Sequence, residues 1–183
     1  MEYTYIDFYL LILLIIACYK DIKTSIIPNV ITFISVIIGI ILNYLYCGFD
    51  GLLFSMFGFL IGFIIFIAPF ILGGMGGGDV KLMAAIGALK GWKFVLLTTI
   101  YSGLAGGIIV IIILIKQKKL LITLKRVIAI ILKPVMFLLT LTFENKKLKQ
   151  FNDWLLDSQI NWEKQYIPYG VAIGIGAIIA LLI

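Results

Sequence analysis

Long apolar segments are the feature that most limits the folds open to this chain of 183 residues. A helix that crosses a bilayer needs about 20 predominantly apolar residues, and several segments here approach that length. Hydrophobic residues make up 63% of the chain and charged residues only 13%. Because a helix satisfies its backbone hydrogen bonds within one segment, we expect an all-α, polytopic helical bundle integral to a lipid bilayer.

The apolar segments predict about six transmembrane helices in a single membrane-embedded domain, residues 1–183. The predicted spans are about 5–20, 28–46, 52–72, 79–92, 94–115 and 167–183. The remaining segment, 116–165, is expected to form amphipathic helices that lie in the cytoplasmic interface. Its part 127–143 is apolar and long enough to be a further crossing, so the sequence leaves both arrangements open.

Basic residues set the expected orientation. Lys20 and Lys23 follow the first span, which places the end of that span in the cytoplasm and the N-terminus outside. The start of the chain is acidic, with Glu2 and Asp7, so the first apolar run is expected to be retained rather than removed as a signal peptide. We expect a multi-pass protein of the cytoplasmic (inner) cell membrane. The net charge of +6 then reflects topology and does not indicate binding of nucleic acid.

Metal and cofactor sites are not predicted. The chain contains no His, and its two cysteines, Cys18 and Cys47, lie in different apolar segments. A zinc site of the usual nitrogen and sulfur ligands is therefore excluded.

Five glycines and a carboxylate lie together between two apolar segments, in the sequence Gly-Gly-Met-Gly-Gly-Gly-Asp that begins at Gly73 and ends at Asp79. Glycine permits positive φ and close backbone approach, so this stretch predicts an irregular, tight turn. A helical pattern resumes after Asp79, which places this carboxylate at or near a helix N-terminus. A flexible loop with an ordinary Asp cap would give the same pattern, but an ionisable residue between membrane spans favours a functional role.

A second carboxylate, Asp21, ends the first span, and Asp79 begins the fourth, so both are expected at the cytoplasmic face. Two carboxylates held within a few ångströms cannot both ionise comfortably, and the pair then shares one proton. Aspartic proteases use this arrangement to activate water and to protonate the leaving amine. The alternative is a small channel or proton-coupled transporter in which Asp21 and Asp79 relay ions. This alternative is weaker because a relay needs carboxylates near the bilayer midplane, whereas Asp21 and Asp79 are expected at span ends on one face.

Three pairs of glycines have the small-xxx-small spacing that lets membrane helices approach closely. They are Gly58 with Gly62, Gly103 with Gly107, and Gly170 with Gly174. For each pair, close helix packing and ordinary glycine content are equally good explanations.

The sequence at 74–82, together with the earlier Asp21 and Pro28-Asn29 and the late Pro168-Tyr169-Gly170, resembles the type IV prepilin peptidase family, which includes preflagellin (archaellin) peptidases. The resemblance covers nearly the whole chain and implies a membrane aspartyl protease of the Gly-x-Gly-Asp (GxGD) kind. It assigns Asp21 and Asp79 as the catalytic pair. The residues that it places around them are Lys23, Pro28, Asn29, Gly76, Gly77, Gly78, Lys81, Pro168, Tyr169 and Gly170. Lys81 is equally explained as a basic residue that marks a span end.

The resemblance also implies a substrate: a type IV pilin-like or archaellin precursor with a short basic leader before a hydrophobic helix. Larger bacterial members carry an amino-terminal segment with paired cysteine motifs and also methylate the new N-terminus with S-adenosylmethionine. This sequence shows neither that segment nor those cysteines. We therefore expect leader-peptide cleavage, with no cofactor and without methyl transfer.

Overall fold

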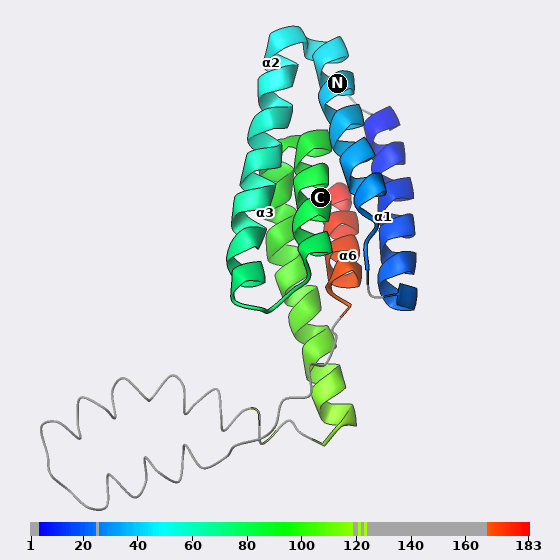
Figure 1. Ribbon diagram of the computed structural model, residues 1–183, viewed down its shortest axis with the longest axis vertical. Coiled ribbons are helices and arrows are strands. Elements are labelled where there is room, and N and C mark those ends of the chain that lie inside the picture. The colour runs from blue at the N-terminus through cyan, green and yellow to red at the C-terminus, as the bar shows by residue number, and fades with distance from the viewer. Residues whose placement is uncertain (1–3, 25, 119–120, 122, 124–167) are drawn as a thin grey trace, which may run out of the picture. The chain divides into compact units, whose positions relative to one another are not determined.

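The computed structural model describes residues 4–24, 26–118, 121, 123 and 168–183. Within these ranges the chain is helical and contains no strand, which confirms the predicted all-α class (Figure 1). The helices are α1 (Thr4–Thr24), α2 (Asn29–Ile71), α3 (Gly77–Lys116) and α6 (Tyr169–Leu182).

Helices α2 and α3 are each broken once by a glycine with positive φ. Gly48 has φ 59° and ψ −138°, and Gly91 has φ 77° and ψ 177°, conformations that glycine adopts at little cost because it lacks a Cβ. Each break divides its helix into two arms, 29–47 and 49–71 in α2, and 77–90 and 92–116 in α3. At each break the chain turns back (Figure 1). The arms of both helices, with α1 and α6, coincide closely with the six apolar segments expected from the sequence.

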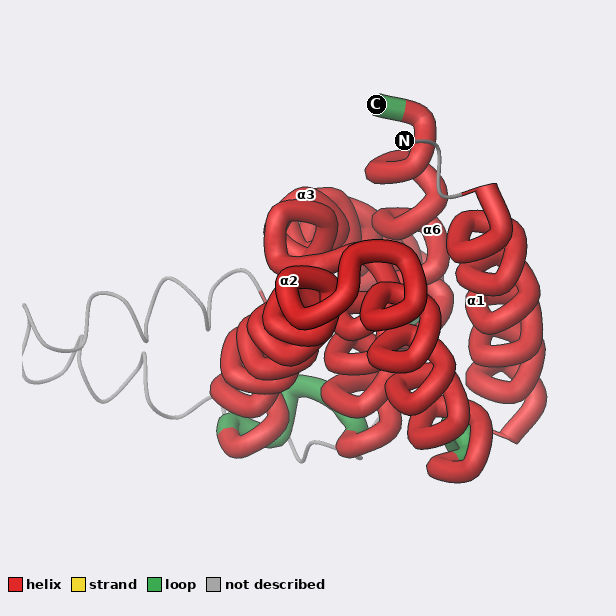
Figure 2. The backbone as a smooth tube through the Cα atoms, turned by 90° about the horizontal axis from the view of Figure 1, so that it is seen from above, coloured by secondary structure: helices red, strands yellow, loops and turns green. Residues whose placement is uncertain are grey.

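The first arm of α3 forms the centre of the fold. Val80 and all residues from Leu82 to Leu89 are buried, although this arm is the shortest of the predicted spans. Around it, α1 packs against both α2 and α6. Both views place α6 between α1 and α3 (Figures 1 and 2). Because neighbouring helices cover this arm, its apolar side chains pack against protein. It therefore does not need the length of a helix that faces lipid across the whole bilayer.

Glycines allow this arm to be approached closely. A Cβ on Gly62 would lie 2.6 Å from the Met83 carbonyl oxygen, and a Cβ on Gly39 would lie 2.8 Å from the Ala88 carbonyl carbon. Gly58 faces the backbone of Gly87 in the same way. No side chain larger than hydrogen fits at these positions, so both arms of α2 lie directly against the first arm of α3.

Two of the three predicted glycine pairs lie at helix contacts. Gly58 and Gly62 face α3, and Gly170 and Gly174 face α1 at Asp21 and Cys18. Gly103 and Gly107 meet open space among the described residues, so of the two explanations left open for this pair the structure favours ordinary glycine content. The glycine of this arm that does lie at a contact is Gly106, against the Tyr169 ring.

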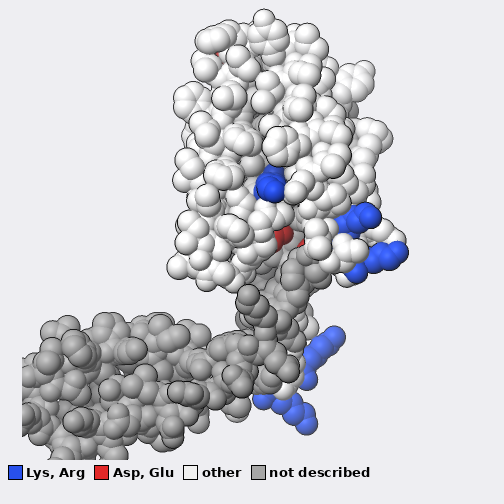
Figure 3. Space-filling view, viewed as in Figure 1, with Lys and Arg blue, Asp and Glu red and all other residues white. Residues whose placement is uncertain are grey.

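Two described helices, α2 and α3, are long and apolar enough to cross a membrane. The outward surface of the bundle carries many exposed apolar side chains, such as Phe33, Leu45 and Ile64. On the face shown in Figure 3, basic side chains of the bundle lie in the half that contains the glycine loop, and the other half is almost free of charge. The basic side chains seen in this view are thus gathered toward one end of the bundle.

The chain forms two compact units: Met1–Ile109 with Tyr166–Ile183, and Val110–Gln165. The first unit contains α1, α2, α6, α3 as far as Ile109, and both glycine breaks. The predicted interfacial segment 116–165 belongs to the second unit, and most of it lies outside the described residues, as does the possible crossing 127–143.

Candidate functional site

The glycine loop begins with a hydrogen-bonded helix end. Gly73 has φ 75°, and its N–H donates to the Phe70 carbonyl at 2.9 Å. The N–H of Gly74 donates to the Pro69 carbonyl, also at 2.9 Å. These two bonds form a Schellman motif, which satisfies carbonyls that the end of α2 would otherwise leave without partners. Gly73 is thus the loop position at which the positive φ favours glycine over other residues.

Asp79 lies in the first turn of α3, two residues after the helix begins at Gly77, which agrees with the expected position at or near a helix N-terminus. The Gly76 N–H donates to Asp79 Oδ2 at 3.0 Å, and the Asp79 N–H donates to the Gly76 carbonyl at 3.1 Å. The bond to Asp79 Oδ2 is the half of a capping box in which a carboxylate in the first turn accepts from the N–H before the helix, and it holds the carboxylate against the loop. Asp79 is 2% exposed.

Gly78 gives the loop its close contact with the segment before α2. A Cβ on Gly78 would lie 3.0 Å from Ile27 Cβ, tighter than most side-chain contacts. A Cβ on Gly77 would meet the Phe70 ring at an ordinary 3.5 Å. Of these two, Gly78 is therefore the residue whose missing side chain brings the α1–α2 connection against the site.

Asp21 lies near the end of α1 and is fully buried. The start of α6 covers it: a Cβ on Gly170 would lie 2.7 Å from Asp21 Oδ2 and 2.9 Å from its Cγ. One turn earlier on α1, Cys18 Sγ donates to the Gly170 carbonyl at 3.6 Å. The last helix of the chain therefore packs its first turn directly on this carboxylate.

Asp21 and Asp79 lie close enough in the fold to interact electrostatically, although 57 residues separate them in the sequence. Asp79 also interacts electrostatically with the hydroxyl group of Tyr169 at the start of α6. The Tyr169 ring packs edge-on against Phe66, with centroids 6.5 Å apart, and over Gly106. Asp79 Oδ1 is buried and forms no hydrogen bond with any described residue. Side chains from α1, α2, α3 and α6 thus meet around two buried carboxyl groups.

Most of the other residues singled out by the sequence lie at the starts of helices, and Lys23 lies on the surface. Lys81 Nζ donates to Asn29 Oδ1 at 2.8 Å, which ties the start of α3 to the start of α2. Pro28 and Pro168 immediately precede α2 and α6, where the fixed φ of proline suits a helix start. Lys23 is exposed, and its ammonium lies 5.6 Å from the Tyr19 ring on its own helix. Lys23 is therefore directed along α1 and not toward the carboxylates.

A buried polar cluster near the Gly91 break was not predicted. Asn43 Nδ2 donates to the carbonyls of Ala88 and Leu89 at 3.1 and 3.2 Å, and Ser55 Oγ donates to the Ala88 carbonyl at 2.6 Å. These carbonyls end the first arm of α3, so they need partners from outside their helix. The available signal was an Asn and a Ser within otherwise apolar segments, where polar side chains are expected to find partners.

Among the described residues, no three His, Cys, Asp or Glu side chains come together in a group that could hold a metal ion. Buried carboxylates that act on each other can hold and transfer a proton, which is the requirement for general acid–base chemistry on water.

The sequence pattern of the type IV leader peptidase family matches residues 8–111, more than half of the chain, and includes both Asp21 and Asp79. The chain is 39% identical over 75 residues to prepilin peptidase EppA of Methanocaldococcus jannaschii, covering 41% of this chain and 20% of that protein. It is 35% identical over 95 residues to a prepilin leader peptidase/N-methyltransferase of Pseudomonas aeruginosa, covering 49% of this chain and 33% of that protein.

A second prepilin peptidase EppA, from Methanococcus maripaludis, is 39% identical over 79 residues, covering 43% of this chain and 21% of that protein. The matched regions thus span a third or less of these relatives. No solved structure matches the chain. The family pattern, which extends over more than half of the chain, shows that this protein belongs to the type IV leader peptidase family.

Proposed function

We propose that the protein is a membrane aspartyl endopeptidase that removes the short basic leader from type IV pilin-like or archaellin precursors. In this proposal Asp21 and Asp79 form the catalytic pair, and cleavage takes place at the cytoplasmic face. The observation that supports it is that two buried carboxylates from distant parts of the chain lie close enough to interact electrostatically, both within the family pattern. The names of the relatives, prepilin peptidases, support the class of substrate.

The chemistry follows from a shared proton. One carboxylate takes a proton from water, and the water oxygen attacks the scissile carbonyl. The partner, as a carboxylic acid, donates its proton to the carbonyl oxygen. When the tetrahedral intermediate collapses, the C–N bond breaks and a proton passes to the leaving nitrogen. The leader gains a C-terminal carboxylate and the mature protein gains an N-terminal amine. The roles of Asp21 and Asp79 are interchangeable in this scheme, because a proton shared by a pair belongs to both.

The proposed placement in the membrane explains how such a substrate reaches the pair. The end of α1, the glycine loop and the start of α6 lie at one end of the bundle (Figure 1). Lys20, Lys23 and Lys81 belong to that end by sequence, which favours the cytoplasmic side. A precursor whose basic leader is in the cytoplasm and whose following helix is in the bilayer presents its scissile bond at this depth.

The proposal is tested by co-expressing the protein with a pilin-like precursor from the same genome and following the mobility of the precursor on a gel. Asp21→Asn and Asp79→Asn should each lower cleavage by at least about a hundredfold, since each removes one proton-carrying group. Both variants should still insert into the membrane at normal levels. Asp50→Asn, a substitution at the start of α2's second arm beside the Gly48 break and far from the carboxylates in the fold, is the matched control and should cleave normally.

Near-normal cleavage by either variant would overturn the catalytic pair. An uncut precursor with the wild-type protein, together with a proton flux that depends on both carboxylates, would instead favour the channel or transporter.

A further inference from the structure

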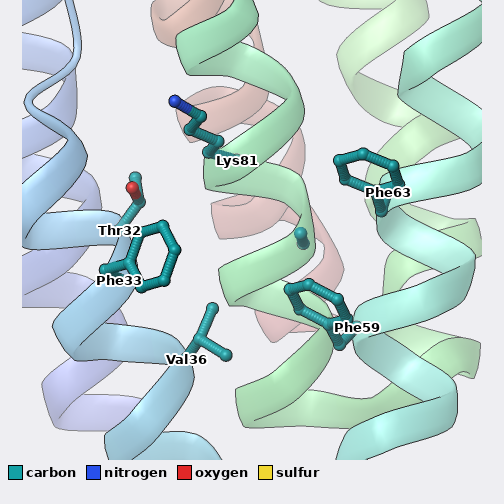
Figure 4. A pocket seen from close by; sticks show the side chains of 7 residues that line it. Thr32, Phe33, Val36, Phe59, Phe63 and Lys81 are labelled. Carbon is teal, nitrogen blue, oxygen red and sulfur yellow. The ribbon is translucent and has the colours of Figure 1, made fainter.

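An apolar cavity of about 320 Å³ lies between the two arms of α2 and is closed on its inner side by the first arm of α3. Thr32, Phe33 and Val36 line it from one arm, and Phe59 and Phe63 from the other (Figure 4). Ala84 and Lys81 of α3 complete it. Almost all of the lining atoms are apolar, although the cavity opens on the outer surface of the bundle.

Lys81 gives one end of this cavity a positive charge. It lies at the end nearest the starts of α2 and α3, where its ammonium donates to Asn29 Oδ1. Among the described residues the one salt bridge joins Asp7 to Lys90, so no described acidic side chain forms an ion pair with Lys81. The cavity thus combines an apolar slot with a cation at its mouth, at the end of the bundle proposed to be cytoplasmic.

The cavity and the carboxylate pair lie on different faces of α3. Successive residues of an α-helix are 100° apart, so Lys81 is rotated by about 200° from Asp79. Asp79 interacts electrostatically with Asp21 of α1 and with Tyr169 of α6, so it faces those two helices. Lys81 and Ala84 face the arms of α2. A helix held in this cavity would therefore be separated from the carboxylates by α3, which argues against the precursor as the occupant.

We propose that this cavity binds one phospholipid of the surrounding bilayer, with an acyl chain between the arms of α2 and the phosphate on Lys81. A cation beside an apolar slot at the cytoplasmic end of membrane helices matches a lipid with an anionic headgroup. An acyl chain in the slot would also give Phe33, Phe59 and Phe63 apolar packing contacts inside the cavity. The inference depends on the membrane placement proposed above and not on proteolysis.

The test uses the full-length protein in nanodiscs of phosphatidylcholine that contain a phosphatidylglycerol with a diazirine at the end of its acyl chain. After photolysis, cross-links are mapped by mass spectrometry. They should concentrate on the lining residues of α2 and α3. Val36→Trp fills the slot and should reduce these cross-links by about tenfold, which corresponds to roughly 1.4 kcal/mol in binding. Val30→Trp, on the same arm but exposed outside the cavity, is the matched control and should keep them.

Lys81→Gln provides a second variant that leaves the slot open. It should retain cross-linking but lose the preference for phosphatidylglycerol over a phosphatidylcholine probe of the same chain. Cross-links spread evenly over the outer surface, or a preference unchanged in Lys81→Gln, would overturn the proposal. Loss of the cross-links on addition of a precursor's hydrophobic helix would also overturn it and would assign the cavity to the substrate. No readout depends on cleavage, so failure here is distinct from failure of the peptidase function.

Discussion

Gly170 lies against the carboxylate of Asp21 so closely that a Cβ on the glycine would be 2.7 Å from Oδ2. The contact joins the first turn of the last helix to the end of the first helix. Because the atom that would be displaced is at the tip of a short side chain, the structure can respond by moving the carboxylate while the helices stay in place. The absence of a side chain at Gly170 thus leaves the space that the Asp21 carboxylate occupies.

Gly170→Ala should therefore impair cleavage more than stability. A displacement of about 1 Å at a catalytic group can cost up to about a hundredfold in rate, and we expect a loss of about ten- to a hundredfold. The temperature of unfolding in detergent should change little. Gly103→Ala is the control, because a Cβ there meets open space among the described residues. Normal cleavage by Gly170→Ala would show that the reaction does not depend on where Asp21 lies.

Asn43→Ala should destabilise the fold without affecting the chemistry directly. It leaves the buried carbonyls of Ala88 and Leu89 with fewer donors, and a buried unsatisfied group costs about 1–3 kcal/mol. Thermal unfolding followed by size-exclusion chromatography measures the effect. Thr99→Ala, which removes a hydroxyl bonded to the Val95 carbonyl of its own helix, should cost less. Equal losses in the two variants would show that the Asn43 cluster has no special role.

Asp7→Asn removes the ion pair with Lys90, which joins α1 to the end of the first arm of α3. Both side chains are partly exposed, so the pair should contribute no more than about 1 kcal/mol to the free energy of unfolding. Cleavage of a precursor should be unchanged, because the pair lies at the end of the bundle away from the carboxylates. A large loss of cleavage with a normal unfolding temperature would mean that this end also takes part in the reaction.

Activity should survive strong chelation. The chain has no His, and the proposed reaction requires two carboxylates and water but no metal. The measurement is precursor cleavage by purified protein in excess EDTA. Loss of cleavage that zinc restores would replace the carboxylate mechanism with that of a metallopeptidase.

The segment 116–165 is predicted to stay on the cytoplasmic side. Single cysteines at 118, 147 and 159, in a variant without Cys18 and Cys47, should resist a membrane-impermeant thiol reagent in intact cells. They should react once the membrane is opened. Labelling at 147 and 159 but not at 118 would establish a crossing at 127–143 and reverse the orientation of α6.

Much of the helical arrangement follows from the sequence because apolar length and glycine punctuation are local signals. The stretch from Gly73 to Asp79 predicts a turn followed by a helix, and the structure has both. The break at Gly91 was also within a few residues of a predicted span boundary. Local patterns are reliable here because each helix satisfies its own backbone.

The contacts between helices were harder to predict, since they depend on which face each helix presents. The spacing of Gly103 and Gly107 is the same as that of Gly58 and Gly62, yet only the latter pair faces a neighbouring backbone. Likewise, Lys23 and Lys81 are both basic residues near span ends, but Lys81 contacts Asn29 while Lys23 lies over Tyr19. No spacing rule within one segment distinguishes these cases. The pairing of Asp21 with Asp79 remains a prediction, which rests on a topology that places the two carboxylates at the same end of the bundle.

The contact between α1 and α6 also has a consequence for the order of events during synthesis. Cys18 and Gly170, which hydrogen-bond in the finished fold, are 152 residues apart in the chain. At roughly 5–20 residues per second, translation needs about 8–30 s to connect them. Until α6 leaves the ribosome, Asp21 has no Gly170 beside it, so the nascent protein passes through a period in which its helices are inserted but its carboxylate pair is unfinished. Under the proposed function, a newly made molecule would then begin to cut precursors only after α6 has left the ribosome and packed against α1.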